Sequence, residues 1–152
     1  ISNKLYKGLD GLEELMERLT REWKDTAKQR YNRKFNRMEY YDGVITGLDG
    51  RPIIVPSEHM LLVYLLQSDE AIMMAKAYTL ANERLAEKYK YGEQYGFLIW
   101  MHDEYQIECD PDIAEDVKRI AEQAIADAGT FFKIKCPHLG SGTVGKSWFE
   151  TH

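Results

Sequence analysis

Two strand-like segments flank three adjacent ionisable residues, and this arrangement constrains the fold more than any other part of the sequence. The run Phe97–Met101 is apolar throughout, as expected for a central strand. His102, Asp103 and Glu104 interrupt it, and Tyr105–Cys109 then alternates apolar and polar residues, as a half-buried strand does. The sequence therefore predicts two strands that place three ionisable side chains at the turn between them.

The chemistry of this turn has two interpretations. The carboxylates of Asp103 and Glu104 repel each other unless a cation or a basic group lies between them. Carboxylate oxygens at a strand turn are good ligands for Mg²⁺. An acidic hairpin tip by itself is more often a solvated turn, so the turn alone leaves both a metal site and a solvated surface open.

Hydrophobic spacing and turn residues predict the elements around these two strands. We expect the following elements in chain order: a helix from about Gly11 to about Lys34, a hairpin of Tyr40–Thr46 and Arg51–Val55 around an Asp-Gly turn, a long and largely buried helix over His59–Tyr89, a helix that starts at Asp110–Asp112 and stops at Gly129, a strand over Phe131–Cys136, and an irregular tail over Gly140–His152. This order predicts an α+β fold with helices packed on an antiparallel sheet.

Composition excludes several classes of protein. A chain of 152 residues with 44% hydrophobic residues can build one real core, and its net charge of −5 excludes a domain that binds nucleic acid by bulk positive charge. Six basic residues nevertheless gather at the end of the first predicted helix and beyond it, and they form either a solvated face or a phosphate-facing surface. They are Lys24, Lys28, Arg30, Arg33, Lys34 and Arg37.

The lack of a visible targeting signal and the use of cysteine favour a cytoplasmic protein with no membrane partner. Cys109 and Cys136 lie far apart and form no Cys-x-x-Cys motif, which is typical of a reduced, intracellular chain. No signal peptide is visible, and the longest apolar stretch, Met60–Leu66, is far shorter than the roughly 20 residues that span a bilayer.

The segment Gly140–Ser147 matches the P-loop pattern letter for letter, but its context argues against a phosphate site. A P-loop needs a buried strand before it and a helix after it. Here Pro137 breaks the preceding strand, and only Trp148–His152 follow. We therefore expect a glycine-rich turn.

Four motifs in order resemble family A DNA polymerases, most closely the bacteriophage replicative members. Trp100–Ile107 is similar to their palm hairpin, and Ile45–Arg51 to the hairpin before their long palm helix. Leu65–Ser68 looks like the glutamine motif of that helix, and Lys146–His152 like their C-terminus. The resemblance covers about residues 43–152, whereas the first forty residues resemble the outer fingers only by position and helical character.

The resemblance implies a fold and a division of the chain. It implies an incomplete polymerase palm, with an antiparallel palm-type sheet, a long buried helix and further helices packed on it. Residues 1–39 would be a helical, outer-fingers-like segment. Residues 40–152 would be the palm segment, with the catalytic hairpin and the C-terminal tail.

The resemblance also implies a role for each site residue in DNA-directed DNA polymerisation, a nucleotidyltransferase reaction of DNA replication. Asp103 would bind the catalytic metal ions, Mg²⁺ or alternatively Mn²⁺, and Glu104 would support that metal site. His102 would contact the primer-terminal nucleotide. Gln67 would reach the minor groove, whose acceptors occupy similar positions in all base pairs; alternatively, Gln67 is only a polar break on a buried helix.

Two features depart from the family's pattern. Val63 stands where these polymerases usually carry an Asn that touches the minor groove, and Asp69 and Glu70 replace small residues. The family's first metal carboxylate comes from an upstream palm strand, and its nucleotide-binding Lys and Tyr come from a fingers helix. Neither segment is in this sequence, which opens with Ile1.

We therefore expect the C-terminal part of a polymerase, inactive without its upstream part. It would be a truncated chain, a proteolytic product or the second half of a split gene, and these alternatives stay open. Its partners would be a DNA primer–template, deoxynucleoside triphosphates and the remaining N-terminal part of the polymerase. An exposed sheet edge would favour self-association or assembly with that part.

Two other functions stay open from the sequence. The first is a small metal-dependent phosphodiesterase or nuclease that uses Asp103, Glu104 and His102. The second is a noncatalytic interaction domain derived from a polymerase, which the acidic balance favours because it weakens nonspecific attraction to DNA.

Overall fold

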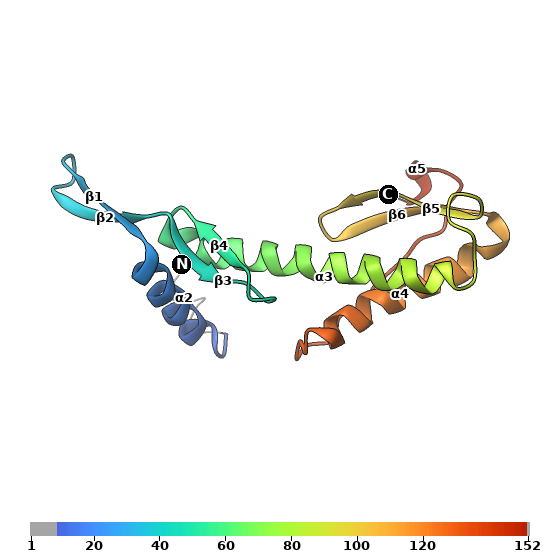
Figure 1. Cartoon of the computed structure of the whole chain (residues 1–152), viewed down its shortest axis with the longest axis horizontal. Coiled ribbons are helices and arrows are strands. Elements are labelled where there is room, and N and C mark those ends of the chain that lie inside the picture. The colour runs from blue at the N-terminus through green and yellow to red at the C-terminus, as the bar shows by residue number, and fades with distance from the viewer. Residues whose placement is uncertain (1–8, 152) are drawn as a thin grey trace. The chain divides into compact units, whose positions relative to one another are not determined.

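The structure, a computed structural model, describes residues 9–151 of a chain that divides into two compact units, Ile1–Asp69 and Glu70–His152 (Figure 1). Each unit combines helices with short antiparallel strands, so the fold class is α+β, as predicted. The strands of the described residues pair two by two in three ladders rather than in one larger sheet. Among the helices of residues 9–151, none has the length and apolar character that crossing a bilayer needs.

The first unit is built around one amphipathic helix and one hairpin. Its elements are α2 (Leu12–Thr26), β1 (Lys28–Asn32), β2 (Arg37–Tyr41), β3 (Gly43–Thr46), β4 (Pro52–Val55), a 3-10 helix (Glu58–Met60) and the start of α3 (Leu61–Ala86). Apolar residues recur at helical spacing along α2 and bury one face against β3, β4 and the first turns of α3. The buried cluster consists of Leu19, Trp23, Ile45, Val55, Leu61 and Leu65.

Trp23 is the centre of this core. Its side chain is 1% exposed, and its indole Nε1 donates a hydrogen bond to the carbonyl oxygen of Val55 at 2.7 Å. Burial of so large a ring, with its polar atom satisfied, ties α2 to β4. The predicted hairpin around Asp49-Gly50 is confirmed, with Gly43 pairing with Val55 and Thr46 with Pro52.

The first predicted helix is too long, because α2 ends at Thr26 rather than near Lys34. Ala27 is extended, and the Thr26 hydroxyl accepts a hydrogen bond from the N–H of Val44 at 2.7 Å. Ala27, the residue at helical spacing after Trp23, packs against this core from beyond the helix end. Residues 28–41 form the β1–β2 hairpin instead, so the first predicted strand of the next hairpin loses Tyr40 and Tyr41 to β2.

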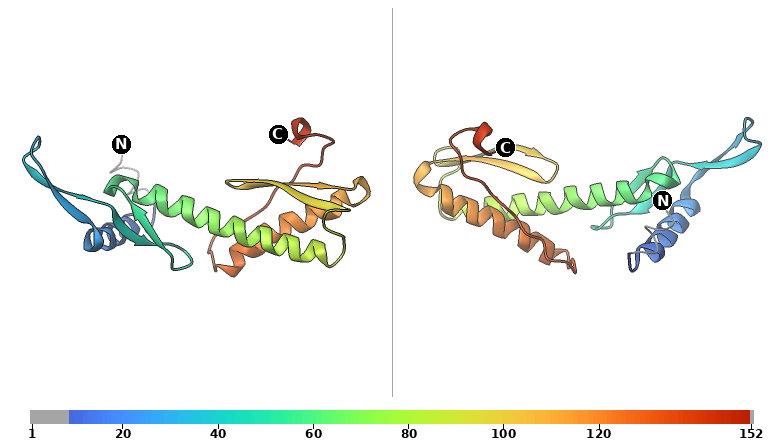
Figure 2. Two further views of the ribbon diagram at one scale, coloured as in Figure 1. Left: turned by 45° about the horizontal axis from the view of Figure 1, so that its top comes forward. Right: turned by 180° about the vertical axis from the view of Figure 1, so that it is seen from behind.

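The second unit packs a hairpin against two helices (Figure 2). Its elements are the rest of α3, β5 (Tyr95–Met101), β6 (Glu104–Cys109), a 3-10 helix (Pro111–Ile113), α4 (Ala114–Phe131) and α5 (Trp148–Thr151). The buried cluster joins α3, β5 and α4 through Leu85, Tyr95, Val117 and Ile120. Phe97 of β5 and Ile107 of β6, which face each other in the ladder, pack against it.

The outer half of β5 is more exposed than predicted for a central strand. The ladder shifts register between Phe97 and Ile99; Leu98, at the shift, is 62% exposed, and Trp100, beyond it, is 45% exposed. Within residues 9–151, β6 is the strand that pairs with β5, so one side of its apolar run stays uncovered. The long helix is likewise less buried than predicted, since Val63 and Leu66 are exposed.

The predicted strand over Phe131–Cys136 does not form. The helix α4 runs past Gly129 to Phe131 and ends in a turn where Lys133 has a φ of 57°. The N–H groups of Lys133 and Ile134 donate to the carbonyl oxygens of Thr130 and Gly129, both at 3.0 Å. This pairing satisfies the last helical carbonyls and turns the chain back along the helix.

The tail then runs along α4 with very little space between the two segments. A Cβ on Gly129 of α4 would lie 2.9 Å from the Cβ of His138 in the tail. Conversely, a Cβ on Gly140 in the tail would lie 2.9 Å from the Cα of Glu122 in α4. Glycine at both positions therefore allows the two backbones to approach closely.

Candidate functional site

The predicted ionisable turn lies at the tip of the β5–β6 hairpin. Met101 pairs with Glu104, so His102 and Asp103 form a two-residue turn. His102 has a φ of 53°. This left-handed conformation is energetically unfavourable for residues other than glycine. The indole Nε1 of Trp100 donates a hydrogen bond to the carbonyl oxygen of His102 at 3.1 Å and helps hold this conformation. The hairpin thus brings three of the four predicted site residues together.

The two carboxylates of the turn differ in their surroundings. Asp103 is exposed, whereas Glu104 is half-buried and accepts a hydrogen bond from the side-chain amide of Gln106 at 2.5 Å. Within residues 9–151, no group of three or more His, Cys, Asp or Glu residues is arranged to hold a metal ion. Mg²⁺ is commonly bound by one or two carboxylates together with substrate phosphates and water, and the pair Asp103 and Glu104 fits that donor set.

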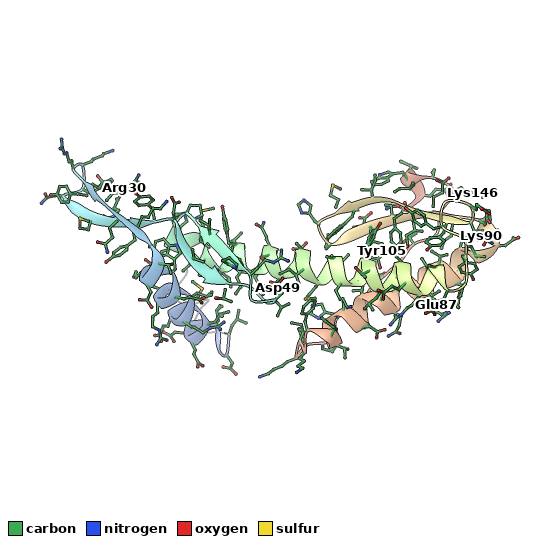
Figure 3. All side chains as sticks on the ribbon, in the orientation of Figure 1. Arg30, Asp49, Glu87, Lys90, Tyr105 and Lys146 are labelled. Atoms are coloured by element: carbon green, nitrogen blue, oxygen red, sulfur yellow. The ribbon has the colours of Figure 1, made fainter. Side chains whose placement is uncertain are left out.

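Aromatic packing holds the base of the turn in place. The hydroxyl of Tyr105, labelled in Figure 3, donates a hydrogen bond to the carbonyl oxygen of Ala121 in α4 at 3.0 Å. The ring of Tyr78 in α3 lies 4.1 Å from that of Phe97 and 6.1 Å from that of Trp100, centroid to centroid. Burial raises the pKa of Tyr105 to about 12. The strands on both sides of the turn therefore rest on the helices of the same unit.

The raised pKa of Tyr105 makes stability in alkali depend on this residue. The ordinary pKa is 10.0, so the stabilisation from the neutral phenol is complete below about pH 10 and is lost as the pH rises towards about 12. We expect Tyr105→Phe to lower the free energy of unfolding at neutral pH by about 1 kcal/mol and to flatten its decline between these pH values. Urea unfolding across this pH range measures both effects. Tyr91→Phe, at an exposed ring, is the control, and an unchanged alkaline decline in Tyr105→Phe would contradict the prediction.

Gln67, the fourth predicted site residue, belongs to the first unit, whereas the turn belongs to the second. It is exposed on α3. Val63 and Leu66 are also exposed, and the spacing of the three residues places them on one face of the helix. Gln67 therefore lies on the exposed face of α3, opposite the buried face of Leu61 and Leu65, and its role stays a prediction.

Asp69 has a role that sequence reasoning missed. Its carboxylate Oδ1 accepts a hydrogen bond from the N–H of Leu48 at 3.0 Å, within the turn that joins β3 to β4. Burial raises the pKa of Asp69, and the nearby carboxylate of Asp49 raises it further. The residue seen from the sequence as an unfavourable charge therefore fixes a turn. No local pattern signals this contact, because the two residues are 21 positions apart.

The hydrogen bond and the charge of Asp69 can be separated by two substitutions. Asp69→Asn keeps an acceptor for the Leu48 N–H and removes the buried charge, so we expect a neutral-pH stability equal to or above that of the wild type. Asp69→Ala removes the acceptor and should cost about 1 kcal/mol. Because the pKa of Asp69 is raised in the folded state, the stability of the wild type should increase relative to that of Asp69→Asn as the pH falls through that pKa. Thermal unfolding at neutral and acid pH measures the stabilities of the wild type and the two variants. Equal losses of stability in Asp69→Asn and Asp69→Ala would contradict the prediction.

The backbone of the P-loop-like segment Gly140–Ser147 is engaged by a side chain of α4. The N–H of Gly142 donates to the carboxylate Oε1 of Glu122 at 2.8 Å, so a carboxylate stands where a phosphate would bind. The helix that follows, α5, has only four residues. Gly140 and Gly142 lie close against Glu122 and Lys118 of α4, and Gly145 lies close against Glu150 and Thr151 of α5.

Comparisons with known proteins place this chain among relatives of phage replication enzymes. No family model matches the sequence. The chain is 35% identical over 112 residues to the DNA-directed DNA polymerase of Enterobacteria phage T3, and 34% identical over 112 residues to that of Escherichia phage T7. Each match covers 71% of this chain but only 16% of the relative. The chain is thus related to a segment of phage DNA polymerases, as its motifs predicted.

Proposed function

We propose that this chain is the catalytic palm-type segment of a family A DNA-directed DNA polymerase, which adds deoxynucleotides to a primer 3′ end. The observation that carries the proposal is the turn of β5–β6, where His102, Asp103 and Glu104 stand together at a hairpin tip. The left-handed conformation of His102 is consistent with the proposal, since such residues occur at active sites as well as in tight hairpin turns. Similarity to phage DNA polymerases supplies the reaction class.

Each residue of the turn has a role in this proposal. Asp103 and Glu104 would hold Mg²⁺, or Mn²⁺, which would stabilise the attacking 3′ oxygen and the leaving pyrophosphate when bound. Asp103, exposed in the turn, would bind directly, and Glu104, already engaged by Gln106, would support it. His102 would contact the primer-terminal nucleotide. Gln67, exposed on α3, would donate to a minor-groove acceptor.

The proposed site needs a further part of the polymerase. Two-metal chemistry places two ions roughly 4 Å apart between carboxylates from separate segments, and the turn supplies two adjacent carboxylates from one segment. The other carboxylate and the groups that bind the nucleotide would come from polymerase sequence upstream of this chain. Its partners would then be that segment, a primer–template and deoxynucleoside triphosphates, in the cytoplasm of a phage-infected host.

Reconstitution tests this function. Primer extension with Mg²⁺ is measured for this chain alone, for the upstream polymerase segment alone and for their mixture. We expect extension only in the mixture, with extension lost when the chain carries Asp103→Asn. Extension by the chain alone would contradict the incomplete site.

The same assay separates the two alternative functions. Divalent-ion-dependent cleavage of DNA by the chain alone, lost in Asp103→Asn, would identify a phosphodiesterase. Primer–template binding without extension in the mixture, unaffected by His102→Ala and Gln67→Ala, would identify a noncatalytic interaction domain.

A further inference from the structure

The β1–β2 hairpin concentrates positive charge in an acidic protein. Residues Lys28–Tyr41, here called the basic hairpin, contain five basic side chains and one acidic side chain, a net charge of +4. The whole chain carries −5, so the rest of the chain carries −9. The five basic residues are Lys28, Arg30, Arg33, Lys34 and Arg37. Such segregation favours a negatively charged ligand for this element.

The strand register gives the hairpin two different faces. Arg30 pairs with Glu39 and Asn32 with Arg37, so the charged residues share one face; Arg30 is labelled in Figure 3. On the other face Tyr31 pairs with Met38, and Tyr31 is 55% exposed. Tyr40 follows on that same face nearer the base of the hairpin, where its ring lies 6.5 Å from that of Trp23, centroid to centroid.

The acidic residues near the hairpin neutralise its base and leave its tip charged. Lys28 forms an ion pair with Asp42 at 3.5 Å, and Arg30 and Arg37 both form ion pairs with Glu39 at 3.6 Å. Among residues 9–151, Arg33 and Lys34 have no ion pair with a carboxylate. With Asp42 counted, a charge of +3 remains: Arg33 and Lys34 carry +2 in the turn between β1 and β2, and Arg30 and Arg37, which share Glu39, keep +1.

An exposed aromatic ring accompanies this charge. Phe35 in the turn is 58% exposed, with the Lys34 ammonium 5.4 Å and the Arg37 guanidinium 5.5 Å from its centroid. A merely solvated tip gains nothing from an exposed phenyl ring. Together with Tyr31, the tip presents two uncovered rings next to two cations.

We infer that the basic hairpin binds single-stranded DNA, with Arg33 and Lys34 on the phosphates and Tyr31 and Phe35 stacked on unpaired bases. Cationic grooves with aromatic platforms are the usual means of binding single strands without sequence preference. In duplex DNA the bases already stack on each other. A duplex would therefore contact the basic side chains of the hairpin but not its aromatic rings. An acidic protein segment would likewise use the charges alone. The inference rests on the proposed function, in which the single strand is the unpaired template.

Two double variants of the full chain separate charge from stacking. Fluorescence anisotropy with a labelled oligodeoxythymidylate measures binding at several salt concentrations. Arg33→Ala with Lys34→Ala should weaken binding on the order of tenfold at low salt and reduce the single-strand salt slope by about 1.4. Tyr31→Ala with Phe35→Ala should weaken binding by about fivefold or more per ring and leave the slope unchanged.

Matched controls remove the same groups elsewhere. Lys135→Ala with Lys146→Ala removes two exposed cations, and Tyr91→Ala with Phe149→Ala removes two exposed rings, and both should bind like the wild type. Circular dichroism checks that all four variants keep the fold. Single-strand binding is measured on this chain alone and primer extension on the reconstituted mixture, so a failure of polymerase function is distinguishable from a failure of this inference.

Four results would overturn the inference. The first is the absence of binding by the wild type at low salt, and the second is an equal loss of affinity in the hairpin variants and the control variants. The third is equal affinity for duplex and single-stranded DNA with no effect of the ring variants. The fourth is a polyglutamate peptide that competes as effectively as the single strand. The expected result is that both hairpin variants bind more weakly than the wild type. Only proteins that keep Tyr31 and Phe35 should prefer the single strand over the duplex.

Discussion

Gly43→Ala is expected to destabilise the first unit by about 3 kcal/mol. An added Cβ at this position would lie well inside contact distance of both Cδ1 and the main-chain oxygen of Trp23. Trp23 is fully packed in the core, and its carbonyl belongs to α2, so neither neighbour can move without disturbing the packing. Overpacking a rigid core of this kind costs about 1–3 kcal/mol and sometimes more. Urea unfolding followed by tryptophan fluorescence measures the loss.

Gly96→Ala is the matched control, since it makes the same change in another strand. No heavy atom lies within 4 Å of the position that its Cβ would occupy. We expect a change of less than about 0.5 kcal/mol. Similar effects at Gly43 and Gly96 would mean that glycine is needed for strand flexibility rather than for the approach of β3 to Trp23.

Asp103→Asn is expected to reduce the single-turnover rate of the reconstituted polymerase by at least about a hundredfold. The substitution keeps the size of an exposed turn residue and removes the charge that would attract Mg²⁺, and losing one preorganised electrostatic group commonly costs this much. Glu104→Gln should cost less, because Gln106 already engages the Glu104 carboxylate. Nucleotide incorporation measured against Mg²⁺ concentration separates weaker metal binding from slower chemistry.

Asp112→Asn removes an exposed charge beyond the other end of β6 and serves as the control. It should leave both the incorporation rate and the Mg²⁺ dependence unchanged. All three variants should unfold at nearly the wild-type temperature, because none of the three side chains is fully buried. Equal rate losses in Asp103→Asn and Asp112→Asn would remove Asp103 from the proposed site.

Elements with a strong local pattern were predicted well from the sequence. The turn around Asp49-Gly50, the β5–β6 hairpin and the helix α4 each carry a turn signal or a regular apolar spacing, and each is present. The candidate turn was predicted for the same reason, because His102, Asp103 and Glu104 interrupt an apolar pattern at one place. The predicted division of the chain at residues 39 and 40, and the role of each site residue, stay predictions.

The failures occur where contacts distant in sequence decide the outcome. Arg and Lys favour helices intrinsically, which supported the longer helix, but α2 ends where the Thr26 hydroxyl accepts a hydrogen bond from Val44 of β3. Likewise, α4 passes Gly129 because that glycine serves the approach of the tail rather than the helix end. The hydrogen bond of Asp69 to the Leu48 N–H belongs to the same class, because it joins a helix to a turn 21 positions away.

The close fit between α4 and the tail restricts the length of the chain more than its composition. Gly129 faces the tail and Gly140 faces the helix, so both must keep their places along the same contact. Inserting or deleting one residue between them would bring Leu139 or Ser141 against Glu122, where a Cβ has no room. Relatives of this protein are therefore expected to differ in residue type along this segment while keeping the spacing between the two glycines.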